Sequence, residues 1–107
     1  MDEPLMSEYA HDPEMSDLII EFLAGLAETC RQLDAYLSAG DLAQVRRIGH
    51  QMKGAGTGYG YPLLTSVGAA LEHATNTDSD VSENVQRQAE LFRQVCARAI
   101  VASTAVP

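Results

Sequence analysis

Residues 37–56 read LSAGDLAQVRRIGHQMKGAG, a stretch that ends one helix, turns and begins another. Gly40 supplies the left-handed residue that commonly ends a helix, and Asp41 with Gln44 has the spacing of a capping box. After the turn, small and apolar residues recur at three- and four-residue steps along one helical face: Leu42, Val45, Ile48, Gly49, Met52 and Ala55. The stretch therefore predicts two antiparallel helices joined by a tight turn.

The helix before this turn is long and amphipathic. Asp12, Pro13 and Glu14 predict its start, because they combine a capping side chain, a residue preset for the first turn and an acid at the positive end of the helix dipole. The predicted inner face consists of Met15, Ile19, Phe22, Leu26, Cys30, Leu33 and Leu37. This spacing predicts a helix from about residue 12 to Gly40.

Four glycines follow at every second position from Gly54 to Gly60. Each costs about 1 kcal/mol relative to Ala inside a helix, so propensity alone predicts that the second helix ends near Gly54. Pro62 is typical of a first helical residue and predicts a third helix. Its predicted inner face consists of Leu64, Val67, Leu71 and Ala74. The polar residues 75–80 predict the next loop.

A last helix is predicted to begin near Ser79 or Asp80, with Glu83 in the capping-box position. Its predicted buried residues are Val85, Ala89, Phe92, Val95, Cys96 and Ala99. Four long helices with short loops predict an all-α fold, namely an antiparallel up-and-down four-helix bundle.

The chain length suits one domain, so we expect residues 1–107 to form a single domain with its core at about residues 12–103. Asp2, Glu3 and Pro4 are compatible with a possible short N-terminal helix. Such a helix would place three apolar side chains against the bundle, those of Leu5, Met6 and Tyr9.

The composition excludes several function classes. The net charge of −8 argues against a nucleic-acid partner, because binding phosphate backbones requires clustered Lys and Arg. Cys30 and Cys96 lie in predicted helices and are expected to be buried free thiols, while His11 and His73 lack neighbouring ligands, so no metal site is expected. The chain lacks an apolar run of about 18 residues and its start is acidic, so we expect no membrane span and a cytoplasmic protein.

The chemistry-bearing residues gather around His50. At about 100° per residue, His50 lies roughly opposite Met52 and should face solvent, on the same side as Arg46, Lys53, Gly54 and Thr57. A single surface histidine needs no special explanation, but an exposed imidazole is also a nucleophile that can take a phosphoryl group. Lys53 would supply charge for that transfer, and Gly54, if it is not simply a helix end, leaves space for an incoming partner.

The motif His50-x-x-Lys53-Gly54, followed by Gly60, resembles the histidine-containing phosphotransfer domain family. The resemblance extends outward to the Gly40-Asp41 turn and to four residues of the third helix: Leu64, Val67, Leu71 and Glu72. It implies a four-helix bundle with an exposed histidine midway along one helix, and a helix that continues through Gly54 toward Tyr59. The sequence departs from the family pattern at Ala55-Gly56, where Ser often follows the Gly, and in the extra Gly58.

Carried over by position, the resemblance implies that His50 is the phosphoacceptor, Lys53 the phosphoryl-stabilising cation and Gly54 the clearance residue. Glu72 falls where relatives often place Gln or Glu to hydrogen-bond the other imidazole nitrogen. The implied partners are receiver domains and sensor or hybrid histidine kinases. No cofactor is expected, since any Mg²⁺ would belong to the receiver.

Three function classes remain to be compared. The first is a phosphoryl carrier that exchanges phosphate with receiver aspartates, and the main alternative is a module that docks a receiver or kinase without exchange. The third is a small helical enzyme, but the sequence offers no paired carboxylates and no Walker-type Gly-Lys-Ser/Thr motif, so we expect no ATP site of its own. We expect a monomeric carrier.

A docking surface is predicted on the first long helix. Taking Leu26 as the centre of its buried stripe, Ile20 and Leu23 lie about 120° and 60° away, so both are expected off the core face with Ala24 and Ala27. Arg46, Arg47, Lys53 and Thr57 would flank this patch. The alternative is that Leu5, Met6 and Tyr9 cover it.

Overall fold

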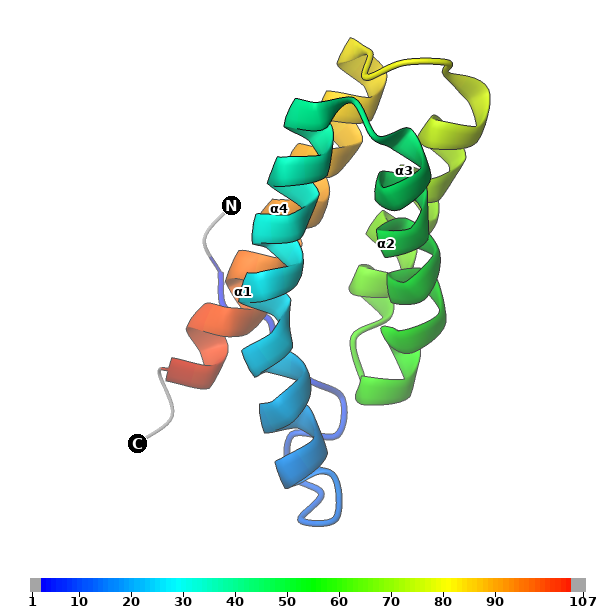
Figure 1. Ribbon diagram of the computed structural model, residues 1–107. Coiled ribbons are helices and arrows are strands. Elements are labelled where there is room, and N and C mark those ends of the chain that lie inside the picture. The colour runs from blue at the N-terminus through cyan, green and yellow to red at the C-terminus, as the bar shows by residue number, and fades with distance from the viewer. Residues whose placement is uncertain (1–2, 105–107) are drawn as a thin grey trace.

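The computed structural model describes residues 3–104, which contain four α-helices and no strand. The helices are α1 (Ser16–Ala39), α2 (Leu42–Ala55), α3 (Pro62–Thr77) and α4 (Glu83–Thr104), with a short 3₁₀-helix η1 (Thr57–Tyr59) between α2 and α3. They run alternately up and down, and the α1–α2 turn and the α3–α4 loop lie at the same end (Figure 1). The predicted all-α four-helix bundle is confirmed.

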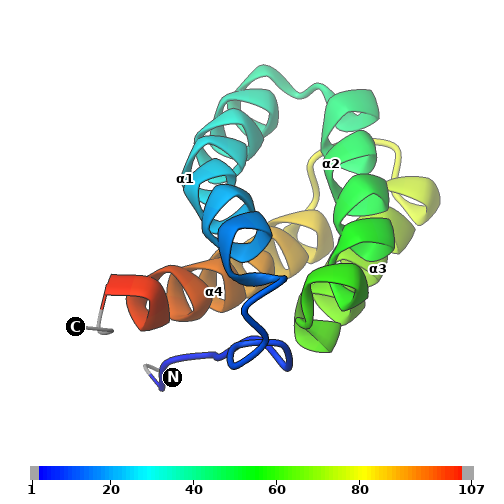
Figure 2. The same ribbon diagram turned by 90° about the horizontal axis from the view of Figure 1, so that it is seen from below.

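Viewed from the end, the helices form a ring in chain order, in which α4 returns beside α1 (Figure 2). Large apolar side chains from all four helices fill the interior. The largest fully buried ones are Phe92, Leu26, Leu33, Leu64, Leu71, Val45 and Val85. All of them lie on the inner faces predicted from the helical spacing.

The turn between α1 and α2 is the one that the sequence predicts. Gly40 has φ +70°, and its N–H donates to the carbonyl of Leu37. The Asp41 carboxylate then accepts the backbone N–H of Gln44 at 3.3 Å and caps α2. This left-handed stop and cap make α1 and α2 antiparallel neighbours.

The other helix ends differ from expectation by a few residues. Residues 12–15 form turns, with Asp12 Oδ1 accepting the N–H of Glu14 at 2.9 Å, and α1 begins only at Ser16. Helix α4 begins at Glu83 instead of near Ser79 or Asp80. Its first turn is capped by Ser82, whose hydroxyl accepts the N–H of Val85 at 3.2 Å. The start of α4 is therefore set by a side chain that satisfies an otherwise unpaired N–H, whereas α1 begins without a side-chain cap.

Helix α2 passes through Gly54 and ends at Ala55, so propensity alone placed its end slightly too early. The chain continues as η1, toward Tyr59 as the resemblance implied, but in 3₁₀ geometry. Gly56 explains the continuation: its N–H donates to Met52, and a Cβ there would lie 2.6 Å from Thr65. Gly60, with φ +85°, ends η1.

The N-terminal segment, residues 3–10, contains no helix, and Asp2, where the possible helix would start, lies outside the described residues. The segment is held by long-range backbone bonds: the Leu5 N–H donates to Arg98 of α4 at 3.0 Å, and the Glu8 N–H donates to Gly60 at 2.8 Å. The Ser7 hydroxyl donates to the Tyr59 carbonyl at 2.6 Å. These bonds to α4, η1 and Gly60 hold the segment in a non-helical path.

Candidate functional site

His50 lies on the outer surface of α2, and 68% of its side chain is exposed. The preceding residue, Gly49, and Met52 two positions on are both buried, so the core-facing side of α2 is turned away from His50. The imidazole is therefore open to a partner, as the helical spacing predicted.

Glu72 of α3 binds both His50 and Lys53. One carboxylate oxygen lies 2.7 Å from His50 Nδ1, and the other accepts a hydrogen bond from Lys53 Nζ, also at 2.7 Å. An ionised carboxylate only accepts hydrogen bonds, so Nδ1 carries the proton and Nε2 holds the free lone pair. In the neutral imidazole, this contact favours the tautomer that leaves the lone pair on the other ring nitrogen, Nε2.

The charge of Glu72 is stabilised by these same contacts. The hydrogen bond from the Lys53 ammonium, and then that from His50, hold the pKa of the Glu72 carboxyl below its ordinary value, while partial burial acts in the opposite direction. Only 17% of the Glu72 side chain is exposed, against 44% for Lys53. Glu72 is thus a largely covered, ionised acceptor between two more exposed groups.

Two glycines bring Glu72 within reach of His50. A Cβ on Gly49 of α2 would lie 2.8 Å from the Glu72 nitrogen and 2.8 Å from the Gly68 oxygen, and a Cβ on Gly68 of α3 would lie 2.8 Å from the Lys53 nitrogen. Side chains at either position would push the helices apart. Sequence reasoning missed Gly68, although a glycine inside a predicted helix was the signal that a close contact lay there.

Gly54 occupies the opposite kind of environment. A Cβ built on it meets no atom within 4 Å, so this exposed position faces open space one turn beyond His50. Nothing in the packing of the bundle requires glycine there.

The other basic and polar residues expected near His50 lie in different environments. Arg47 is exposed, whereas Arg46 is half-buried and its Nε has no hydrogen-bond partner among the described residues. The Thr57 hydroxyl lies 2.9 Å from that of Thr65, and its N–H donates to the same oxygen at 2.8 Å. Thr57 therefore joins η1 to α3.

The expected patch on α1 is partly covered. Ile20 is 61% exposed and Ala24 is exposed, but Leu23 is only 8% exposed, so the prediction that Leu23 lies off the core face is wrong. Leu23 is buried because it follows Ile19 by four residues and precedes Leu26 by three, within one stripe. With Leu5 and Met6 it lines a cavity of about 340 Å³.

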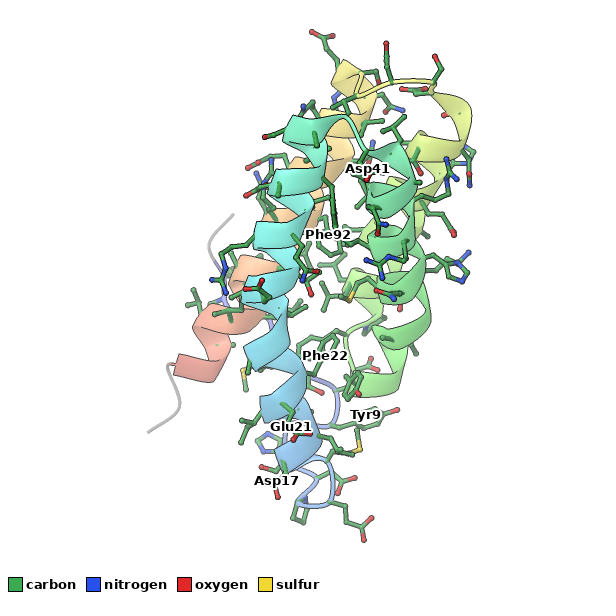
Figure 3. All side chains as sticks on the ribbon, viewed as in Figure 1. Tyr9, Asp17, Glu21, Phe22, Asp41 and Phe92 are labelled. Atoms are coloured by element: carbon green, nitrogen blue, oxygen red, sulfur yellow. The ribbon has the colours of Figure 1, made fainter. Side chains whose placement is uncertain are left out.

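The two sides of α1 face different neighbours. Phe22 stacks on Tyr59 of η1 with a centroid distance of 4.3 Å, so its side of α1 faces the end of α2 (Figure 3). Ile20 lies about 160° from Phe22 around the helix and lines the cavity together with Ala102 of α4. Leu18, four residues before Phe22 and 46% exposed, is an exposed apolar residue on the same side of α1 as Phe22.

Among residues 3–104, no group of three or more His, Cys, Asp or Glu side chains is placed to hold a metal ion. Within the same range, no helix is both long and apolar enough to cross a bilayer.

Comparison with known proteins identifies the family. No curated protein and no solved structure matches the chain. A family model described as Hpt domain matches residues 17–100, a span that begins at the first turn of α1 and contains His50, Lys53 and Glu72. Hpt domains are helical phosphocarriers that interact with histidine kinases and receiver domains. The chain therefore belongs to the Hpt domain family, whose function is histidine phosphotransfer in phosphorelays.

Proposed function

We propose that this protein carries a phosphoryl group on Nε2 of His50 and exchanges it with aspartates of receiver domains. One observation supports this most directly: Glu72 accepts hydrogen bonds from both His50 Nδ1 and Lys53 Nζ. The arrangement leaves an exposed nucleophilic nitrogen with a cation one turn away, which is what phosphoryl transfer requires.

In the forward step, the Nε2 lone pair attacks the phosphorus of a receiver's aspartyl phosphate. A P–N bond forms while the P–O bond to the aspartate breaks and leaves a carboxylate on the receiver. The imidazole ring becomes positively charged, because Nδ1 keeps its proton, and the Glu72 carboxylate stabilises that charge. Lys53 offsets the charge of the phosphoryl oxygens, and the open space at Gly54 admits the receiver. The return step reverses these changes.

The receiver docks across the α2 surface around His50. The exposed Arg47 and the flanking Arg46 and Lys53 give this surface a positive potential on an acidic protein, which complements the acidic phosphorylation site of a receiver. Thr57 borders it on η1. Leu18 on α1 provides an apolar anchor on the α2 side, and Ile20 with Ala24 forms a second exposed patch around the helix.

The test of the carrier function is phosphate acceptance from a phosphorylated receiver, followed by mass spectrometry for an acid-labile phosphate. His50→Gln is expected to abolish acceptance with little change in stability, because the side chain is exposed. His73→Gln, which changes another exposed histidine on α3, is the matched control and should accept phosphate normally. A receiver that binds the parent without any transfer would favour the docking module instead.

The docking surface is tested by Leu18→Asp and Ile20→Asp, which place the same charge on opposite sides of α1. We expect Leu18→Asp to weaken receiver binding, measured by titration calorimetry, while both variants keep the parent's helicity. Loss of affinity only in Ile20→Asp would show that the receiver docks on the side of α1 that faces α4.

A further inference from the structure

Cys30 and Cys96 lie on the neighbouring helices α1 and α4. The register of these antiparallel helices is fixed by an ion pair in which Arg93 Nη1 lies 2.7 Å from Asp34 Oδ1. Cys30 precedes Asp34 by about one turn, and Cys96 follows Arg93 by about one turn, so the antiparallel register brings the two thiols together. Cys96 is part of the hydrophobic core, and Cys30 packs against the same core.

The two thiols differ in access. Cys96 is fully buried, whereas Cys30 is only half-buried and has a path to solvent. The hydrogen bond from Cys96 holds the pKa of the Cys30 thiol below its ordinary value, against the effects of burial and Asp34. The same bond and burial raise the pKa of Cys96. Cys30 is thus the thiol that ionises and is reached first, and Cys96 retains its proton.

Neither thiol takes part in the phosphate chemistry, since His50 and Glu72 lie on the other two helices. We propose that Cys30 and Cys96 form a redox-active pair, which a hydroperoxide converts reversibly into a disulfide between α1 and α4. This proposal goes beyond the phosphocarrier function and does not depend on it.

The reaction proceeds in two balanced steps. The Cys30 thiolate attacks one oxygen of the hydroperoxide, the O–O bond breaks, and with one proton the products are Cys30 sulfenic acid and one molecule of water or alcohol. The Cys96 sulfur then attacks the sulfenic sulfur, which forms the S–S bond and releases water as the Cys96 proton joins the departing hydroxide. The two thiols are oxidised by two electrons and the peroxide is reduced. A dithiol reverses the change.

The disulfide would stabilise the protein because it closes a long loop that includes α2 and α3. Such a bond restricts the unfolded chain, and the expected rise in the thermal midpoint is on the order of 10 °C. The His50 site would be left intact, since the bond joins only α1 and α4.

The test uses the purified full chain, treated with a slight excess of hydrogen peroxide, blocked with N-ethylmaleimide and analysed by mass spectrometry. We expect a monomer that has lost two hydrogen atoms, carries no maleimide and yields a linked Cys30–Cys96 peptide. Its thermal midpoint should rise and return after dithiothreitol. A disulfide-linked dimer, or a parent protein that keeps both thiols or over-oxidises Cys30, would overturn the proposal.

Single variants separate the two roles. In Cys96→Ser, dimedone should trap a sulfenic acid on Cys30, because no resolving thiol remains. In Cys30→Ser, the buried Cys96 should stay reduced under the same treatment. Equal oxidation of Cys96 in Cys30→Ser would contradict the assigned order. If Cys96→Ser does not fold, the linked peptide in the parent and the reduced thiol in Cys30→Ser still decide the proposal.

Discussion

The α2–α3 pair and the α1–α4 pair are packed in different ways. Helices α2 and α3 approach main chain to main chain, with Gly49 and Gly68 at the contact. Helices α1 and α4 are neighbours that contribute large side chains such as Leu33 and Phe92 to the core, and the Asp34–Arg93 ion pair bridges them. His50, Lys53 and Glu72, the residues of the proposed phosphotransfer site, all lie on the first pair.

The two kinds of packing serve different purposes: the α2–α3 contact fixes the geometry of the site, and the side-chain core contributes to stability. Contact between two backbones leaves little room for adjustment, so Glu72 is held at a defined distance from His50. A core of interdigitating side chains contributes more to the free energy of unfolding, but it relaxes partly when one of them changes. We therefore expect changes in α1 and α4 to lower mainly stability, and changes at the contact between α2 and α3 to lower mainly phosphotransfer.

The largest loss of stability is expected from Leu33→Ala. Leu33 is fully buried, and truncating such a leucine costs about 3 kcal/mol through lost burial and the cavity that remains. Urea unfolding measures the loss. The folded variant should still accept phosphate at close to the parent's rate, and a rate that falls with stability would show that the two helix pairs are not separable.

Compared with Leu33→Ala, Gly49→Ala is expected to lose less stability and more phosphate acceptance. The new Cβ meets rigid backbone of α3, and such overpacking costs about 2 kcal/mol. It also moves Glu72 away from His50, so phosphate acceptance should fall in the folded protein. Gly25→Ala is the control: its Cβ meets no atom within 4 Å, and the change should stabilise α1 by up to about 1 kcal/mol.

A change of function without a change of packing is expected from Glu72→Ala. Removing the acceptor releases Nδ1, so both imidazole tautomers become populated and transfer slows by about tenfold. Nitrogen NMR of His50 reports the tautomers directly. Glu72→Gln keeps an acceptor oxygen and should retain most of the preference for protonated Nδ1. Equal tautomer populations in both variants would show that the bond does not orient the ring.

The smallest expected effect is on the pH dependence of stability. The Glu72 pKa is lowered mainly by Lys53, so the folded protein binds fewer protons than the unfolded chain in the pH range between the two pKa values. The stabilisation is complete above the ordinary carboxyl pKa and is lost as pH falls through the lowered one. Lys53→Ala should raise the Glu72 pKa, measured by carboxyl carbon NMR, and flatten this acid loss of stability. If the Glu72 titration does not change, Lys53 is not the cause of its lowered pKa.

The local features of the fold were predictable from the sequence. The spacing of apolar residues identified the inner faces, and Gly40 with Asp41 identified the first turn, because such signals act within a few residues of the chain. The helix starts were less accurate, since several capping side chains compete in each loop. Ser82 in place of Asp80 is one example.

The long-range features were not predictable in the same way. The path of residues 3–10 depends on bonds to Arg98 and Gly60 that leave no local pattern. Likewise, the helical wheel placed His50 on the surface but said nothing about its contact with Glu72, which only the resemblance to a family implied. That contact follows from how α2 and α3 sit against each other, a tertiary property. The burial of Leu23, by contrast, could have been predicted from its spacing from Ile19 and Leu26.

The main-chain contact at Gly49 and Gly68 has a consequence for protein design. Because the geometry of the His50–Glu72 contact depends on two backbones, a designer who modifies the protein must keep α2 and α3 together with both glycines. The exposed residues of α1 can then be rewritten for a new receiver without retuning the histidine. After a gene duplication, the two copies could acquire different signalling partners in the same way, through changes in α1, as long as both glycines are kept.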